Sequence, residues 1–320
     1  MKARPATPLL LLLALCLAPA ARAQSAAAPA AALAAHSAAP SGAPPAGRSA
    51  PIVEADAEQL ARAIAAEESG QWDLARTLYD ELALAAPEDF RVALGLSRVH
   101  TAQGRPWEAA TVLEQASAAH PDSVRLLRAA GDAILAAGST SMALETYDRA
   151  LALAPADRGL RCAAAWAAVA GRRSDRLLEL LAPVPMDDIP APLQRALGRA
   201  ALLGNQPELA VASLEALLAG VAGSPPATSA ADVAAAVDAL LDLARAHLLL
   251  GHDGPALETL RLALAQQPGC AAAYVLLGHL RLRGNQRELA LASYEEGIRR
   301  GADAAPLAPL LARLRSPDRP

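Results

Sequence analysis

Residues 124–157 read VRLLRAAGDAILAAGSTSMALETYDRALALAPAD, and this stretch decides the fold. It holds two segments with apolar residues at helical spacing, which Gly138 separates, and it closes at Pro155. Apolar residues spaced three and four apart give each segment one apolar helical face. Glycine ends a helix and lets the chain turn, and proline stops a second helix from continuing. The stretch therefore predicts a hairpin of two antiparallel helices.

The same pattern returns every 34 residues from about residue 56 onward. Four kinds of residue share this period. They are the prolines Pro87, Pro121 and Pro155, the glycines Gly70, Gly104 and Gly138, the alanines Ala75, Ala109 and Ala143, and the helix caps Asp89, Ser123 and Asp157. A fixed period of this length indicates stacked copies of one supersecondary unit. A single hairpin cannot bury its apolar faces alone, so the copies must pack into a solenoid.

The repeat resembles the tetratricopeptide repeat (TPR) family. That family has a small residue at position 8, glycine near 15, alanine at 20, an aromatic residue or leucine at 24, alanine at 27 and proline at 32. In residues 124–157 these positions hold Gly131, Gly138, Ala143, Tyr147, Ala150 and Pro155. The resemblance implies an all-α fold, a right-handed α-solenoid of about seven TPR helix hairpins with a C-terminal capping helix.

The solenoid is expected over residues 51–304, with a capping helix and tail over 305–320. The repeats are placed near 56–89, 90–123, 124–157, 158–190, 191–224, 237–270 and 271–304. The repeat at 158–190 is degenerate, because Leu177 replaces the small residue at position 20 and two prolines follow closely. Between 219 and 231 the sequence predicts an inserted loop, after which a long helix is expected to begin near Ser229.

Residues 1–23 have the features of a secretory signal peptide: a positive start, an apolar run over 9–17 and an A-x-A site before Gln24. Residues 24–50 are rich in Ala, Pro and Ser and are expected to form a disordered linker. We therefore expect a periplasmic or secreted protein, with cleavage between Ala23 and Gln24. A lipid anchor at Cys16 is the less favoured alternative, because a large residue precedes that cysteine.

The sequence contains no catalytic or metal-binding pattern that indicates an enzyme, so we expect neither catalysis nor a cofactor. Acidic residues outnumber basic ones, 33 to 29, which argues against nucleic acid as a partner. His100 and His247 share repeat position 11 and are interpreted as packing residues. Cys162 and Cys270 lie three repeats apart, too far for a disulfide in a solenoid, and are expected to be free buried thiols.

The TPR resemblance implies that the first helix of each repeat lines a concave groove, with positions 2, 5, 9, 12 and 13 facing a partner. Arginines are frequent at these positions, and arginine binds carboxylates through two parallel hydrogen bonds. The candidate partner-binding residues are Arg98, Arg128, Trp166, Arg195, Arg199, Arg245 and His279. The alternative is that these arginines only solvate the surface or pair with neighbouring acidic residues.

Fold, export signal and groove together favour a non-catalytic protein–protein interaction scaffold or adaptor in the bacterial cell envelope. Its partner is expected to be a protein or peptide bound in the arginine-lined groove, with no transmembrane span in the chain itself. Two alternatives stay open: a scaffold that binds or assembles an anionic exopolysaccharide, and a structural solenoid that associates with itself.

Overall fold

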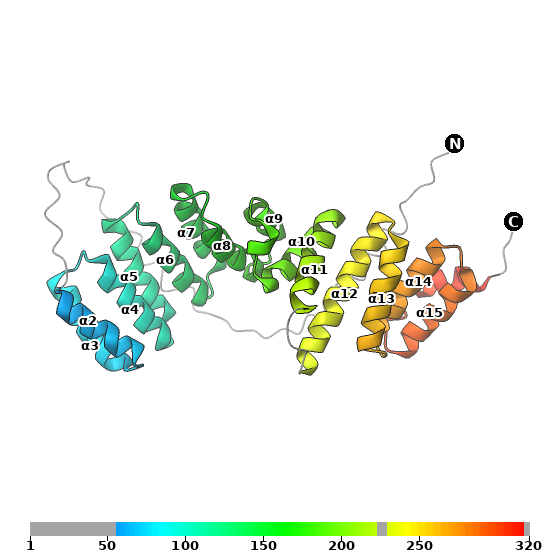
Figure 1. Ribbon diagram of the computed structural model, residues 1–320, viewed down its shortest axis with the longest axis horizontal. Helices are drawn as coiled ribbons and strands as arrows, with labels where there is room; N and C mark the ends of the chain where they lie inside the picture. Colours follow the sequence, from blue (N-terminus) through cyan, green and yellow to red (C-terminus); the bar gives the residue numbers. More distant parts are fainter. Residues whose placement is uncertain (1–55, 223–228, 317–320) are drawn as a thin grey trace. The chain divides into compact units, whose positions relative to one another are not determined.

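The computed structural model describes residues 56–222 and 229–316, and over these residues the chain is an all-α solenoid (Figure 1). No strand occurs within these two ranges. The expected signal peptide (1–23), the expected linker (24–50) and the last four residues of the expected tail lie outside the described residues.

Helices in the described ranges pair in chain order into hairpins. The pairs are α2 (Ala57–Glu68) with α3 (Trp72–Ala85), α4 (Phe90–Ala102) with α5 (Pro106–Ala119), α6 (Val124–Ala136) with α7 (Thr140–Leu153), α8 (Arg158–Ala170) with α9 (Ser174–Leu181), α10 (Ala191–Leu203) with α11 (Pro207–Ala222), α12 (Ala230–Leu250) with α13 (Asp253–Gln266), and α14 (Ala271–Arg283) with α15 (Arg287–Arg299). A short 3-10 helix, η1 (Met186–Asp188), follows α9, and α16 (Ala308–Arg315) packs against α15.

Capping residues and glycines set the ends of these helices, as the repeat pattern predicts. The Asp157 carboxylate accepts a hydrogen bond from the backbone N–H of Leu160 at 2.9 Å, which satisfies one free donor at the start of α8. Gly138 has a φ of +87° in the turn between α6 and α7. That left-handed conformation strains residues with a side chain, so the turn requires glycine or a close substitute.

The two helices of a hairpin cross closely because small residues face a large one. Ala143 is fully buried where α7 meets α6. The Tyr147 ring lies over Gly131, where an added Cβ would stand only 2.6 Å from the Tyr147 Cε1 atom. Repeat positions 8 and 24 are therefore coupled: the glycine is small because the tyrosine fills its space.

The hairpins stack through two kinds of contact. Each second helix packs against the first helix of the next hairpin, for example α5 against α6 and α7 against α8. Successive first helices also touch one another, as α4 does with α6 and α6 with α8. Successive second helices in the described ranges have no contact of comparable extent. The first helices are thus the more closely spaced set and form one continuous side of the stack.

Two regions depart from the regular repeat. Helix α9 is only 8 residues long, and the segment after it packs Val184 and Ile189 into the core. The predicted loop at 219–231 begins too early, because α11 continues to Ala222 through a run of good helix formers. Helix α12 starts at Ala230 behind the N-cap Ser229, as predicted, and is 21 residues long.

Buried cysteines and histidines behave as packing residues. Cys162 and Cys270 are buried and unpaired, as expected. The His100 and His247 rings are also buried, which confirms their interpretation as packing residues.

None of the helices over 56–222 and 229–316 is both long and apolar enough to cross a membrane.

Candidate functional site

Two adjoining hollows open on the side formed by the first helices. One, of about 650 Å³, lies between α4 and α6, and the other, of about 490 Å³, lies between α6, α8 and the η1 segment. Arg128 and Asp132, one helical turn apart on α6, line both hollows. These two residues therefore form the divide between neighbouring parts of one surface.

Arg128 is exposed and makes no hydrogen bond or ion pair with any residue that the structure describes. Its guanidinium group lies beside the start of α8, because a Cβ added at Gly159 would stand 3.4 Å from the Arg128 Nη1 atom. A cation in this position is available to an outside group. Of the predicted site arginines it is the one that the structure leaves without an internal partner in the described ranges.

Asp132 is partly engaged. One of its carboxylate oxygens, Oδ1, accepts a hydrogen bond from the Tyr147 hydroxyl at 2.6 Å. Burial and this carboxylate together raise the pKa of Tyr147, so the tyrosine stays a hydrogen-bond donor. The second oxygen, Oδ2, has no hydrogen-bond partner in the described part of the chain, and Asp132 lines both hollows.

Trp166 lies in the same hollow as Arg128, as the groove prediction requires. Its side chain is on α8 and the residue is 40% exposed, which is high for so large an apolar group. Leu135, Ala163 and Pro190 give this hollow an apolar wall beside the indole. An ion pair between Arg158 and Asp188 ties the start of α8 to η1 along the same wall.

Arg98 lines the α4–α6 hollow but already has a partner. It forms an ion pair with Glu67 of the preceding repeat, with 2.8 Å between Arg98 Nη2 and Glu67 Oε2. The Tyr79 hydroxyl donates to the same Glu67 oxygen at 2.9 Å. Burial raises the pKa of Glu67, but the hydrogen bonds from Arg98 and Tyr79 outweigh it and lower that pKa overall.

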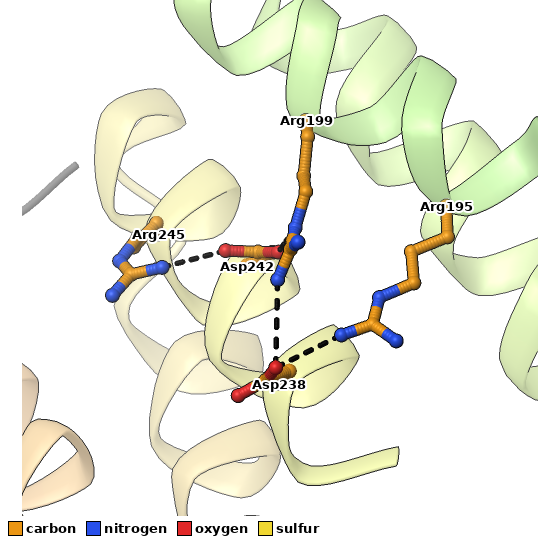
Figure 2. A network of polar contacts seen from close by, with 5 residues as sticks. All are labelled: Arg195, Arg199, Asp238, Asp242 and Arg245. Carbon is orange, nitrogen blue, oxygen red and sulfur yellow. Dashed lines mark hydrogen bonds and ion pairs between the residues drawn. The ribbon is translucent and has the colours of Figure 1, made fainter. Parts of the chain in front are cut away.

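Arg195 and Arg199 join α10 to α12, and Arg245 pairs within α12 itself (Figure 2). Arg195 Nη2 lies 2.9 Å from Asp238 Oδ2, and Arg199 reaches both Asp238 and Asp242. Asp242 is buried and takes bonds from Arg199 Nε at 2.8 Å and from Arg245 Nη1 at 2.5 Å. These three arginines therefore pair with neighbouring acidic residues, which is the alternative that the sequence analysis left open.

The expectation that His279 faces a groove is wrong. Its ring is only 2% exposed, and its Nδ1 atom lies 2.9 Å from the Tyr294 hydroxyl. Burial lowers the pKa of His279 to about 4, so the ring is neutral near pH 7. The physical reason is that in this repeat, as in residues 124–157, the residue at position 9 is the hydrogen-bond partner of the tyrosine at position 24.

Sequence reasoning missed the wall that η1 adds to the α6–α8 hollow. Asp188 and Pro190 belong to the segment that replaces the end of a regular second helix, so the repeat pattern assigns them no position. The signal available was the group of prolines from 183 to 190, which ends α9 early. Over the described residues, no group of side chains has the arrangement of a metal site.

Comparisons with known proteins agree with this architecture. Residues 66–131 match the tetratricopeptide repeat family. A chain in the structure of Naa15/Naa10 bound to HypK-THB is similar over 82% of this chain, with 18% identity and a TM-score of 0.54. This chain spans only 39% of that one. The C-terminal part of a TPR repeat-containing protein from Cytophaga hutchinsonii is similar over 78% of this chain and 99% of its own length, with 12% identity and a TM-score of 0.52.

No curated protein sequence matches this one closely enough to count as a relative. The structural likenesses, at such low identity, concern the fold alone. They nevertheless agree with the family match and with the 34-residue hairpin repeat described above. On these findings residues 66–131 match the tetratricopeptide repeat family, and the described residues have the fold of TPR proteins.

Proposed function

We propose that this protein is a non-catalytic interaction scaffold of the bacterial cell envelope, which binds a segment of a partner protein across α4, α6 and α8. The observation that carries the proposal is Arg128, an exposed cation without an internal partner at the divide between two hollows. TPR proteins bind protein or peptide partners. A free guanidinium group suits a carboxylate of such a partner, because it can donate two parallel hydrogen bonds.

The surroundings of Arg128 support a protein ligand. The α4–α6 hollow has an apolar floor that includes Leu94 and Ala129, and the α6–α8 hollow has the exposed Trp166. Apolar pockets beside a few charged groups are typical of sites where an aromatic or aliphatic side chain anchors a partner. Arg125 adds a second cation on the same face of α6, three residues before Arg128.

Arg195, Arg199, Arg245 and His279 have no part in this proposed site. The three arginines satisfy Asp238 and Asp242, and the histidine is buried. A ligand that took these arginines would have to leave the buried Asp242 carboxylate without a partner, which costs free energy. The proposed site therefore occupies the N-terminal half of the described solenoid.

The cell-envelope location rests on the sequence of residues 1–23, with its charged start, apolar run and A-x-A site. Mass spectrometry of the protein purified from its own cells tests it. Soluble export predicts a protein that begins at Gln24, whereas a lipid anchor predicts one that begins at a lipid-modified Cys16. A protein that retains residues 1–23 intact would contradict the proposed location.

Site-specific photo-crosslinking in cells tests the scaffold function. A photoreactive residue replaces Thr101, which is exposed and lines the α4–α6 hollow, and the control carries it at Ala152, exposed on the second helix α7. The proposal predicts a discrete crosslink to another protein from position 101 that is absent from position 152.

The other outcomes of this crosslinking each identify a different function. A crosslink with the mass of two copies of this chain would replace the scaffold by a self-associating solenoid. A broad, polysaccharide-digestible adduct would favour the anionic polysaccharide. Equal crosslinking from both positions would contradict binding on the first-helix side.

A further inference from the structure

The hollow between α6 and α8 contains a cation and an exposed indole, which lie at different positions along α8. The Arg128 guanidinium group lies beside Gly159 near the start of α8, and Trp166 lies seven residues later on the same helix. Seven residues of α-helix rise by about 10 Å. The α8 position beside the free cation and the α8 position that bears the exposed indole are thus about 10 Å apart along one hollow of about 490 Å³.

We infer that this hollow binds an extended segment of the partner protein in which an acidic residue and an aromatic residue are three positions apart. The inference rests on the proposed function and names the chemistry of its ligand. The carboxylate would meet Arg128, and the aromatic ring would stack on Trp166 against Ala163 and Pro190.

Spacing decides which residues of the partner reach both ends of the hollow. In an extended polyproline II conformation, side chains three residues apart point the same way and stand about 9 Å apart. In a flat β-strand, residues three apart point to opposite faces, so that conformation does not place both groups in the hollow. The 10 Å separation along α8 therefore selects a three-residue spacing in a polyproline II-like segment.

An α-helical ligand fits this hollow poorly. The reason is chemical and lies in Asp132. Its Oδ2 oxygen has no hydrogen-bond partner in the described ranges and can accept a backbone N–H, which an extended segment offers and a helix interior does not.

Charges around the hollow leave Arg128 as the group that an anion would meet. Arg158 and Asp188 neutralise each other, and Asp132, with one oxygen taken by the Tyr147 hydroxyl, attracts hydrogen-bond donors and not anions. Arg125 of α6 lines the neighbouring α4–α6 hollow instead, where its guanidinium group lies over the Phe90 ring. Burial raises the pKa of the Cys162 thiol, which lines the hollow as a neutral apolar group.

Trp166 supplies its own reporter. The chain has three tryptophans, at 72, 107 and 166, so the full chain with Trp72→Phe and Trp107→Phe carries one indole, in the hollow. The probes are acetylated, amidated hexapeptides, which have no terminal charges: AEAAFA and its reverse AFAAEA, AQAAFA without the acid, AEAAAA without the ring, and AEFAAA with the wrong spacing. Trp166 fluorescence is titrated with each peptide.

We expect AEAAFA or AFAAEA to bind saturably and about tenfold more tightly than the other peptides. Arg128→Ala should weaken this binding about tenfold while leaving the affinity for AQAAFA unchanged. The matched control is Arg149→Ala, an exposed arginine of the same repeat on the second helix α7, and it should change neither affinity.

Three results would overturn the inference. They are no saturable signal from either parent peptide, equal affinity for AEFAAA, or an Arg128→Ala effect of the same size on AEAAFA and AQAAFA. Any of these alongside a specific crosslink from position 101 would leave the scaffold function intact and remove only the ligand chemistry. Binding as expected without any protein crosslink would instead remove the proposed cellular function.

Discussion

At the scale of single residues, Tyr147 and Tyr294, each at position 24, explain which side chains their repeats tolerate on the first helix. Tyr147 fills the space over Gly131, and its hydroxyl donates a hydrogen bond to the Asp132 carboxylate. Tyr294 fills the space over Gly278 in the same way, and its hydroxyl shares a hydrogen bond with His279 Nδ1. The residue at position 9 is therefore available to a binding partner only where the residue at position 24 does not form a hydrogen bond with it.

Ala143 tests the register at this scale. Replacing it by Phe should cost about 1–3 kcal/mol or more, because the site is fully buried and its neighbours must move. Ala152→Phe is the matched control, the same change on the exposed face of α7. Urea unfolding measures both, and equal free energies of unfolding for the two variants would contradict the helix crossing described here.

His279 gives a prediction about pH. Burial lowers its pKa to about 4, whereas a histidine in the unfolded chain has a pKa of about 6.5. Between these values the unfolded state binds a proton that the folded state does not, so stability falls as pH falls through this window. The full contribution is about 3 kcal/mol, since each pKa unit corresponds to about 1.4 kcal/mol.

His279→Gln keeps an acceptor for the Tyr294 hydroxyl but cannot take up a proton. The parent should therefore lose up to about 3 kcal/mol more free energy of unfolding than this variant between pH 6.5 and pH 4. Burial also lowers the pKa values of His100 and His247, and these act equally in both proteins. Parallel stability curves would show that the His279 ring is not buried as described.

At the scale of elements, both apolar contacts and charges hold the junction between α10 and α12. Two apolar clusters there contain Ala201, Leu202, Ala210 and Ala246 in one group and Leu214, Leu217, Ala239 and Leu243 in the other. The ion pairs of Figure 2 connect the same two helices. The sequence inserted between α11 and α12 also interrupts the 34-residue register at this junction.

The two aspartates of this junction should differ strongly when changed. Asp242→Asn removes the partner of Arg199 and of the largely buried Arg245, and the cost should be about 3–5 kcal/mol. Asp238→Asn affects an aspartate whose side chain is 53% exposed, and it should cost at most about 1 kcal/mol. Urea unfolding of both variants decides. Equal, small losses would mean that the buried network does not hold α10 to α12.

At the scale of the whole molecule, the sequence predicted the repeats because the same small, capping and turn residues recur every 34 positions. It also placed Arg128 and Trp166 on one side of the solenoid, where they line one hollow, because position in a regular repeat determines which side a residue faces. The pairing of Arg195 with Asp238 was hidden, since 43 residues, including the insertion, separate them. The prediction for His279 was wrong for another reason. Its ring forms a hydrogen bond with a tyrosine 15 residues later, and the repeat period alone does not reveal such a contact.

The central claim is that a partner protein binds at Arg128, on the side formed by the first helices. It is tested most directly by quantitative affinity capture from an envelope extract of the source cells, with three baits: the parent chain, Arg128→Glu and Arg149→Glu. Both arginines are exposed and unpaired within the described residues of the same repeat, so each charge reversal should leave the fold intact. The account predicts one partner that the parent and Arg149→Glu retain and Arg128→Glu loses. Equal capture by all three baits would contradict it.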